Sequence, residues 1–101
     1  MRLKAKRDGN ELEIVAALRY CGASVTFLSL PDVPDLLVGF QSNTYLIEIK
    51  SPKGKLREGQ QEWINNWRGG DVHVVRTVDE ALNVIKLGRA GSSKIRFGGT
   101  M

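Results

Sequence analysis

The chain has very little of the side chains that build soft-ligand metal centres: among 101 residues it has one cysteine, Cys21, and one histidine, His73. A lone cysteine cannot form an internal disulfide, and the two residues together cannot supply the ligands of a structural zinc site. Any metal site would therefore use oxygen ligands, which favours magnesium, manganese or calcium. We interpret Cys21 as a small packed residue and His73 as a structural residue of a short strand.

Long apolar runs are lacking as well. No run approaches the roughly 20 residues that a bilayer span needs. The basic start, residues 1–7, has no apolar stretch of the kind found in a signal peptide. With a single cysteine and no sign of an export signal, we expect an intracellular protein that has no membrane among its partners.

Positive charge is what the chain has in excess. The 15 Lys and Arg residues against 11 Asp and Glu give a net charge of +4, within a composition that is 42% hydrophobic and typical of one folded domain. The basic residues gather in three clusters, at 1–7, 50–57 and 86–96. Each cluster alone could be a solvated surface, whereas together they could flank a groove for a polyanion.

Local patterns predict an alternating order of helices and strands. Apolar periodicity and capping residues predict helices over 10–21, 57–67 and 77–87. Asp8 or Asn10 would cap the first helix, Gly22 would close it, and Thr77 and Glu80 have the spacing of a capping box at the third. Runs of β-forming residues predict strands over 24–28, 35–40, 44–50 and 71–75, with a hairpin connection at 41–43.

The order α-β-β-β-α-β-α predicts a single α/β domain, in which one mixed β-sheet is flanked by helices. We expect a basic N-terminal arm over 1–9, the folded domain over 10–87, and a Gly/Ser-rich basic segment over 88–101. The last segment could be a tail or could add a short strand around 94–97.

The strand over 44–50 carries charge on one face. Because side chains alternate along a strand, Glu48 and Lys50 project together, while Tyr45, Ile47 and Ile49 face the core. A charged pair of this kind could be an ordinary device that keeps an edge strand from aggregating.

Asp35 gives the charged pair another meaning. It opens the preceding strand, and a hairpin about 41–44 would bring it beside Glu48. Two adjacent carboxylates repel unless a cation or proton joins them, and with a backbone carbonyl and waters they suit Mg²⁺ or Mn²⁺. Lys50 could then orient or deprotonate a water, or steady the charge that develops at phosphorus. The alternative is that Asp35 is a turn residue after Pro34.

Two helices each place one polar residue on an apolar stripe. Glu11 lies in the middle of the stripe of the first helix, formed by Ile14, Val15 and Leu18; alternatively it belongs to a frayed first turn and meets the helix dipole. Gln60 lies in the stripe formed by Trp63, Ile64 and Trp67, and alternatively it caps a nearby backbone group. Both residues point to the side where Asp35, Glu48 and Lys50 are expected.

These residues resemble a known family. Pro34-Asp35 followed by Glu48-Ile49-Lys50 resembles the PD-(D/E)XK nuclease signature, and the expected order resembles the αβββαβ core of that restriction-endonuclease-like superfamily, with an added C-terminal helix. The chain is similar to the VRR-NUC group over about residues 10–85. This closer resemblance rests on the segments 48–51, 53–56, 60–63 and 74–81.

The resemblance implies a role for each site residue. Asp35 and Glu48 would be metal ligands together with the backbone carbonyl of Ile49, and Glu11 would help to hold the metal or its waters. Lys50 would be the catalytic lysine and Gln60 the helix glutamine of the site. The basic residues that directly follow the catalytic strand are our candidates for phosphate contacts. They are Lys53, Lys55 and Arg57.

The family cleaves phosphodiester bonds in DNA with Mg²⁺ or Mn²⁺ and no small-molecule cofactor. Small members of viral type are similar to homodimeric endonucleases that act on four-way junctions, which implies the cytoplasm of a prokaryote or of a phage-infected host cell. A dimer is also reasonable physically, because symmetric incision of two strands requires two copies of one small site. Trp67, Tyr20 or the C-terminal segment could form its interface. A nuclease for flaps, nicks or a short sequence, and a non-catalytic DNA-binding module, remain as alternatives.

Overall fold

The structure, a computed structural model, describes residues 9–89, with the backbone alone for residues 87–89. Residues 1–8 of the arm expected over 1–9, and residues 90–101 of the segment expected over 88–101, lie outside the described residues. The elements follow the predicted order α-β-β-β-α-β-α. They are α1 (Glu11–Tyr20), β1 (Ser24–Phe27), β2 (Leu36–Phe40), β3 (Asn43–Ile49), α2 (Glu58–Asn66), β4 (Val72–Val75) and α3 (Val78–Arg89).

The four strands form one mixed sheet in the order β1-β2-β3-β4. The first three strands are antiparallel neighbours, whereas β4 lies parallel to β3. This parallel pairing is possible because α2 returns the chain to the starting end of β3. The fold is therefore an α/β domain with a mixed sheet, as the sequence predicts.

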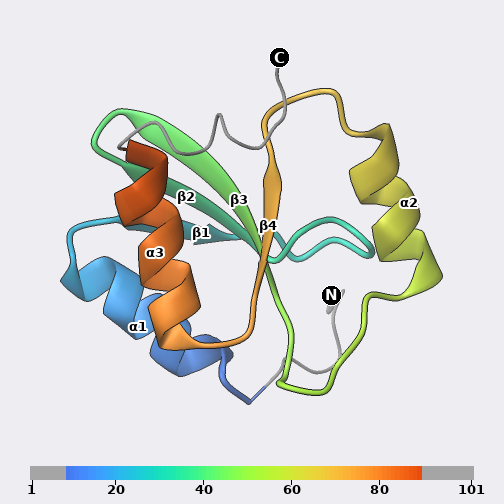
Figure 1. Cartoon of the computed structure of the whole chain (residues 1–101), viewed down its shortest axis with the longest axis horizontal. Coiled ribbons are helices and arrows are strands. Elements are labelled where there is room, and N and C mark those ends of the chain that lie inside the picture. The colour runs from blue at the N-terminus through green and yellow to red at the C-terminus, as the bar shows by residue number, and fades with distance from the viewer. Residues whose placement is uncertain (1–8, 90–101) are drawn as a thin grey trace.

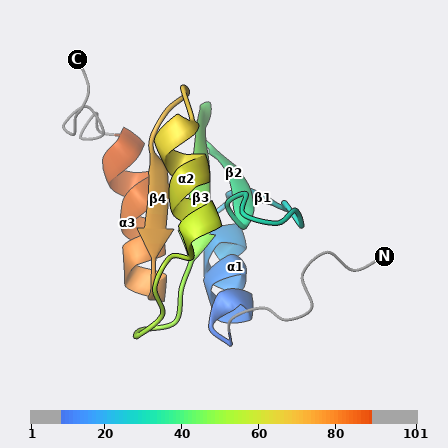
Figure 2. The same cartoon turned by 90° about the vertical axis from the view of Figure 1, so that its right-hand side faces the viewer.

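The helices lie on opposite sides of the sheet. In Figure 1, α1 and α3 lie together on one side of β4, and α2 stands apart on the other side. Seen from that second side, α2 lies in front of β3 and β4 (Figure 2). We call the side of the sheet covered by α1 and α3 the inner face, and the side toward α2 the outer face.

The core occupies the inner face. Ile14 and Leu18 of α1, Leu36 of β2, Ile47 of β3 and Ile85 of α3 are fully buried. The stripe predicted for the first helix is confirmed, because Val15 is buried as well. From α3, Ala81 is also buried, while Val78 and Leu82 pack partly buried against the core. The inner-face residues predicted for the charged strand are buried as well. They are Tyr45, Ile47 and Ile49.

Local geometry agrees with two of the predicted chain reversals. After α1, Gly22 has φ +100°, and its N–H and that of Ala23 bond to the carbonyls of Arg19 and Leu18 in a Schellman motif. The β2–β3 hairpin turns through Gln41 and Ser42, both with positive φ, because a two-residue turn of type I′ requires the left-handed region twice.

Two local expectations are wrong, and a third is met only in half. Asn10 stands at the start of α1, but its side chain makes no capping bond to the helix. The Glu80 N–H donates to Thr77 Oγ1, which is one half of the predicted capping box, but the Glu80 carboxylate accepts from Arg76 N rather than from the Thr77 N–H. Cys21 is exposed, because it lies at the open C-terminal end of α1 rather than on its packed face.

None of the helices within residues 9–89 combines the length and the apolar character that crossing a membrane demands.

Candidate active site

Four polar or charged side chains are buried among those the structure describes, and they are Glu11, Asp35, Glu48 and Gln60. All four are candidate site residues from the sequence. Their exposed fractions lie between 2% and 7%, close to those of the apolar core. Burying such groups is costly unless partners compensate for the lost water, so the geometry around each one is informative.

Asp35 and Glu48 come together at one end of the β2–β3 hairpin. Leu36 pairs with Ile47, and continuing this antiparallel register sets Asp35 opposite Glu48. Since Leu36 and Ile47 face the core, the two carboxylates belong to the outer face. Asp35 Oδ2 accepts a hydrogen bond of 2.8 Å from the backbone N–H of Ile49. The hairpin thus brings Asp35 next to the end of β3 that carries Glu48.

Glu48 is held by neighbours from two directions. Lys50, directly after β3, places Nζ 3.6 Å from Glu48 Oε2. Gln60 in the first turn of α2 donates from Nε2 to the same oxygen at 2.9 Å. Gln60 Oε1 in turn accepts from the backbone N–H of Arg57 at 2.8 Å. Gln60 thus both faces the site and caps a backbone group, so the two interpretations of this residue hold together.

Glu11 is buried in the first turn of α1, which excludes the frayed, exposed turn. The adjacent residue, Asn10, donates from Nδ2 to the carbonyls of Lys50 at 3.1 Å and Arg76 at 2.9 Å. This pair of bonds ties the start of α1 to the ends of β3 and β4. Glu11 therefore lies at the same end of the sheet as Glu48 and Lys50.

The donor set suits a hard divalent cation with several water ligands. Within residues 9–89, no three carboxylate, imidazole or thiol groups converge into a ready-made metal cage. The site instead offers the buried carboxylates of Asp35 and Glu48, with the Ile49 carbonyl as a further oxygen. Mg²⁺ is commonly bound by one or two carboxylates plus water and substrate phosphate, so these residues fit it. A ligand role for Glu11 stays a prediction.

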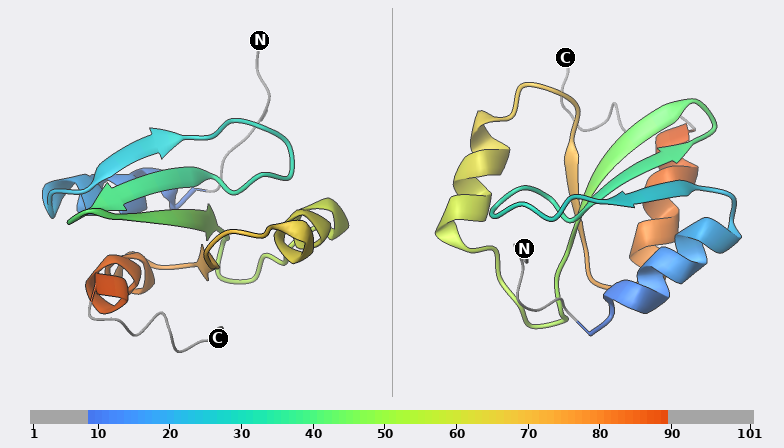
Figure 3. Two further views of the ribbon diagram at one scale, coloured as in Figure 1. Left: turned by 90° about the horizontal axis from the view of Figure 1, so that it is seen from above. Right: turned by 180° about the vertical axis from the view of Figure 1, so that it is seen from behind.

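The residues predicted to contact phosphate lie in the loop between β3 and α2. Lys53, Lys55 and Arg57 are all exposed there. Arg57 is engaged with Asp32 of the β1–β2 connection, with Nη2 3.4 Å from Asp32 Oδ1. Figure 3 shows that connection reaching the start of α2. A Cβ at Gly59 would lie 2.5 Å from Asp32 Oδ2, so a larger residue there would push the Asp32 carboxylate out of its present place.

The apolar stripe of α2 is only partly covered. Gln60 is its one buried member, Trp63 and Ile64 are half-buried, and Trp67, just beyond the helix, is 43% exposed. The rings of Trp63 and Trp67 stack with centroids 4.9 Å apart. The second helix is therefore held to the sheet at its first turn by polar contacts rather than by a continuous apolar seam.

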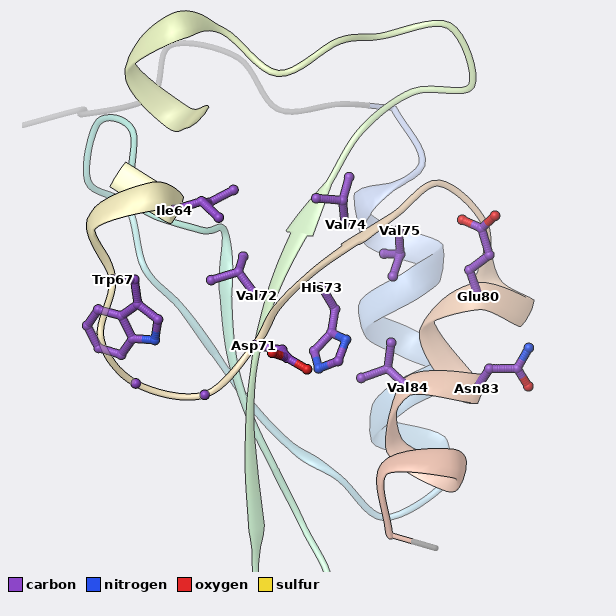
Figure 4. A pocket seen from close by; sticks show the side chains of 12 residues that line it. Ile64, Trp67, Asp71, Val72, His73, Val74, Val75, Glu80, Asn83 and Val84 are labelled. Carbon is purple, nitrogen blue, oxygen red and sulfur yellow. The ribbon is translucent and has the colours of Figure 1, made fainter. Parts of the chain in front are cut away.

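A cavity of about 650 Å³ lies elsewhere, along β4 between the end of α2 and α3 (Figure 4). Ile64 and Trp67 border it on one side, Asn83 and Val84 on the other. Its lining does not include Asp35, Glu48, Lys50 or Gln60. His73 lines this cavity and sets its ring edge-on to Tyr45, with the centroids 6.1 Å apart, in keeping with a structural role.

The sequence pattern did not mark Asn10 and Arg76 as members of this end of the sheet. Arg76 donates from Nη1 to the carbonyls of Ser51 at 2.7 Å and Gly54 at 2.6 Å. The partners of Asn10 and Arg76 are backbone carbonyls 22 to 66 residues away in sequence, so no local pattern marks them. Comparison with models of known protein families and with curated proteins finds no match for this chain.

Proposed function

We propose that this chain is a divalent-metal-dependent DNA endonuclease that hydrolyses phosphodiester bonds. The observation that carries the proposal is the burial of Asp35, Glu48 and Gln60 at one end of the sheet, with Lys50 Nζ 3.6 Å from Glu48. A carboxylate pair beside a lysine costs stability in a domain of this size unless a ligand uses it. Exposed lysines on the adjoining loop supply the positive surface that a polyanion needs.

Each residue has a role in this proposal. Asp35, Glu48 and the Ile49 carbonyl would hold Mg²⁺ or Mn²⁺, and Glu11 would help to hold its waters. When bound, the metal supplies Lewis-acid stabilisation of the phosphate and lowers the pKa of a bound water. Lys50 orients the attacking water or stabilises the negative charge at phosphorus. Gln60 fixes the orientation of the Glu48 carboxylate through its bond to Oε2.

We further propose that the substrate is branched DNA, with the four-way junction as the leading candidate, and that the enzyme acts as a homodimer. One site on an 11.2 kDa chain can cut one strand, so paired incision requires a second copy related by symmetry. Such an enzyme would act in the cytoplasm of a prokaryote or of a phage-infected cell, where its substrate is found.

The test is a cleavage panel with purified protein. End-labelled four-way junction, flap, nicked and plain duplex DNA are each incubated in Mg²⁺, in Mn²⁺ and in EDTA, with folding checked by circular dichroism and mass by light scattering. The proposal expects metal-dependent cutting, fastest on the junction, by a species of twice the chain mass. If flaps, nicked DNA or one sequence are cut faster than the junction, that DNA is the substrate instead. Binding without cutting in any metal leaves a DNA-binding module instead.

A further inference from the structure

Arg76 joins two segments that meet beside the proposed active site. It directly follows β4, and its backbone N–H donates to Glu80 Oε1 in the first turn of α3. Its guanidinium reaches in the other direction, to the chain that leaves β3. One nitrogen, Nη1, donates to the carbonyl of Ser51 at 2.7 Å and to that of Gly54 at 2.6 Å. Arg76 is thus anchored on α3 and holds the loop after Lys50.

The two carbonyls are the ends of one tight turn. Gly54 N donates to Ser51 O at 3.0 Å, which closes the four-residue turn Ser51–Gly54. Because one Arg76 nitrogen takes both end carbonyls, it fixes the orientation of the turn against β4 as well as its closure.

The preceding residue is held from another side. Lys50 O accepts from the Asn10 amide, which also donates to Arg76 O. The backbone from Lys50 to Gly54 is therefore tied to α1 through Asn10 and to β4 through Arg76. These side chains come from distant parts of the sequence, and both contact the short segment that follows the catalytic strand.

The turn carries positive charge at a fixed place relative to the carboxylates. Lys53 lies within it and Lys55 directly follows it, and both side chains are exposed. Lys50, directly before the turn, lies 3.6 Å from Glu48 Oε2. A flexible loop would present the same charges over a range of positions, and DNA binding would then have to overcome the entropy lost on ordering it.

We infer that Arg76 is a positioning residue for DNA: it holds the Ser51–Gly54 turn so that Lys53 and Lys55 meet the phosphates beside the bond to be cut. This inference rests on the proposed nuclease function. It assigns Arg76 a role through the turn rather than through its own contact with DNA, and this distinction can be measured.

The experiment is a double-mutant cycle on binding. A fluorescently labelled four-way junction is titrated with wild-type protein, Arg76→Ala, Lys53→Ala/Lys55→Ala and the triple variant, in Ca²⁺ and at several salt concentrations. Arg76→Ala is expected to weaken binding about tenfold and to make the slope of log K against log salt shallower by up to about 2, the value for two phosphate contacts. The triple variant should bind within about twofold of the double lysine variant.

Other outcomes overturn the inference. If the effects of Arg76→Ala and of the lysine pair multiply in the triple variant, Arg76 contacts phosphate itself. If Arg76→Ala binds like wild type, the contacts between Arg76 and the turn have no role in DNA binding. Arg68→Ala, which removes an exposed arginine beyond α2, serves as the matched control and should bind like wild type.

Two further variants protect the test against a folding defect in Arg76→Ala. Arg76→Lys keeps the charge and one donor group, and should restore part of the affinity. Gly54→Pro removes the N–H that closes the turn onto Ser51 O and should reproduce the loss; a Gly54→Pro protein with wild-type affinity would overturn the inference.

Cleavage in Mg²⁺, measured on the same samples, separates the inference from the proposed function. The fold-increase in KM caused by Arg76→Ala should be at least about five times the fold-decrease in kcat, because Arg76 acts on DNA binding. Wild-type protein that binds but never cuts defeats the nuclease proposal, while the binding cycle still decides the role of Arg76. Wild-type protein that cuts, with an unaffected Arg76→Ala variant, defeats the role of Arg76 alone.

Discussion

The inner and outer faces of the sheet bury different kinds of groups. On the inner face, α1 and α3 cover apolar residues such as Leu36 and Ile47, which are fully buried. On the outer face, the apolar Leu37 and Val74 stay 39% and 37% exposed, while the charged Glu48 is 2% exposed. A fold selected only for stability would bury the leucine and expose the carboxylate. The burial of Glu48 and the exposure of Leu37 and Val74 therefore lower the stability of the fold at the end where the proposed site lies.

Removing the Glu48 charge should have the largest effect on cleavage and almost none on folding. Gln is nearly the same shape and can still accept from Gln60 Nε2, but it is a poor ligand for Mg²⁺. Because metal stabilisation of the transition state is worth several kcal/mol, we expect Glu48→Gln to cut about 10³-fold more slowly. Single-turnover cleavage of the best substrate measures this, with Glu62→Gln on the exposed side of α2 as the control.

Neighbouring leucines of β2 test the two faces directly. Leu36→Ala should destabilise the fold by about 2–5 kcal/mol, because it empties a fully buried site. Leu37→Ala, one residue along and on the outer face, should cost less than about 1 kcal/mol, because Leu37 is already 39% exposed. Urea unfolding of both variants measures the difference, and equal losses would show that the outer face is covered in solution.

Metal bound at the outer face should stabilise the whole domain against unfolding. At ten times its dissociation constant, Mn²⁺ should add about 1.4 kcal/mol to the free energy of unfolding, which raises the melting temperature by roughly 5–10 °C. Asp35→Asn keeps an oxygen that can accept from Ile49 N but removes one carboxylate, so its melting temperature should hardly respond. Thermal melts with and without EDTA decide this. The same rise in both proteins would place the ion elsewhere.

The smallest expected effect concerns Arg57, which Asp32 holds at 3.4 Å in an exposed pair. DNA phosphates compete with Asp32 for this guanidinium, so Asp32→Asn should tighten binding about two- to threefold, as expected for a weak surface ion pair. Asn tolerates the left-handed backbone at position 32, where φ is 67°. Fluorescence anisotropy with labelled duplex measures the change. Weaker binding would mean that Asp32 serves mainly to hold α2 in place.

The sequence predicts the order of elements and the position of Asp35 beside the end of β3 because both depend on local rules. Strand alternation sets the face of Glu48, and the short hairpin sets Asp35 opposite it. Burial of Glu11 and Gln60 follows from helical spacing. In each case a period of two or of 3.6 residues carries the information.

The tertiary contacts around the site could not be predicted in the same way. Asn10 looks like a helix cap, yet its amide bonds to carbonyls 40 and 66 residues away. The tryptophan stripe of α2 has the right spacing for burial, but Trp67 is exposed because a period identifies a face without saying what covers it. Whether the chain belongs to the VRR-NUC group stays a prediction.

The most direct test of the central claim is the Lys50→Ala variant, with cleavage and binding measured on the same labelled junction. Lys50 Nζ lies beside Glu48, while its backbone is held independently by Asn10. We predict that Lys50→Ala stays folded and binds DNA within a few-fold of wild type, but loses metal-dependent cutting by two or more orders of magnitude, about the contribution of one catalytic group. A Lys50→Ala protein that cuts at the wild-type rate would contradict the assignment of this site.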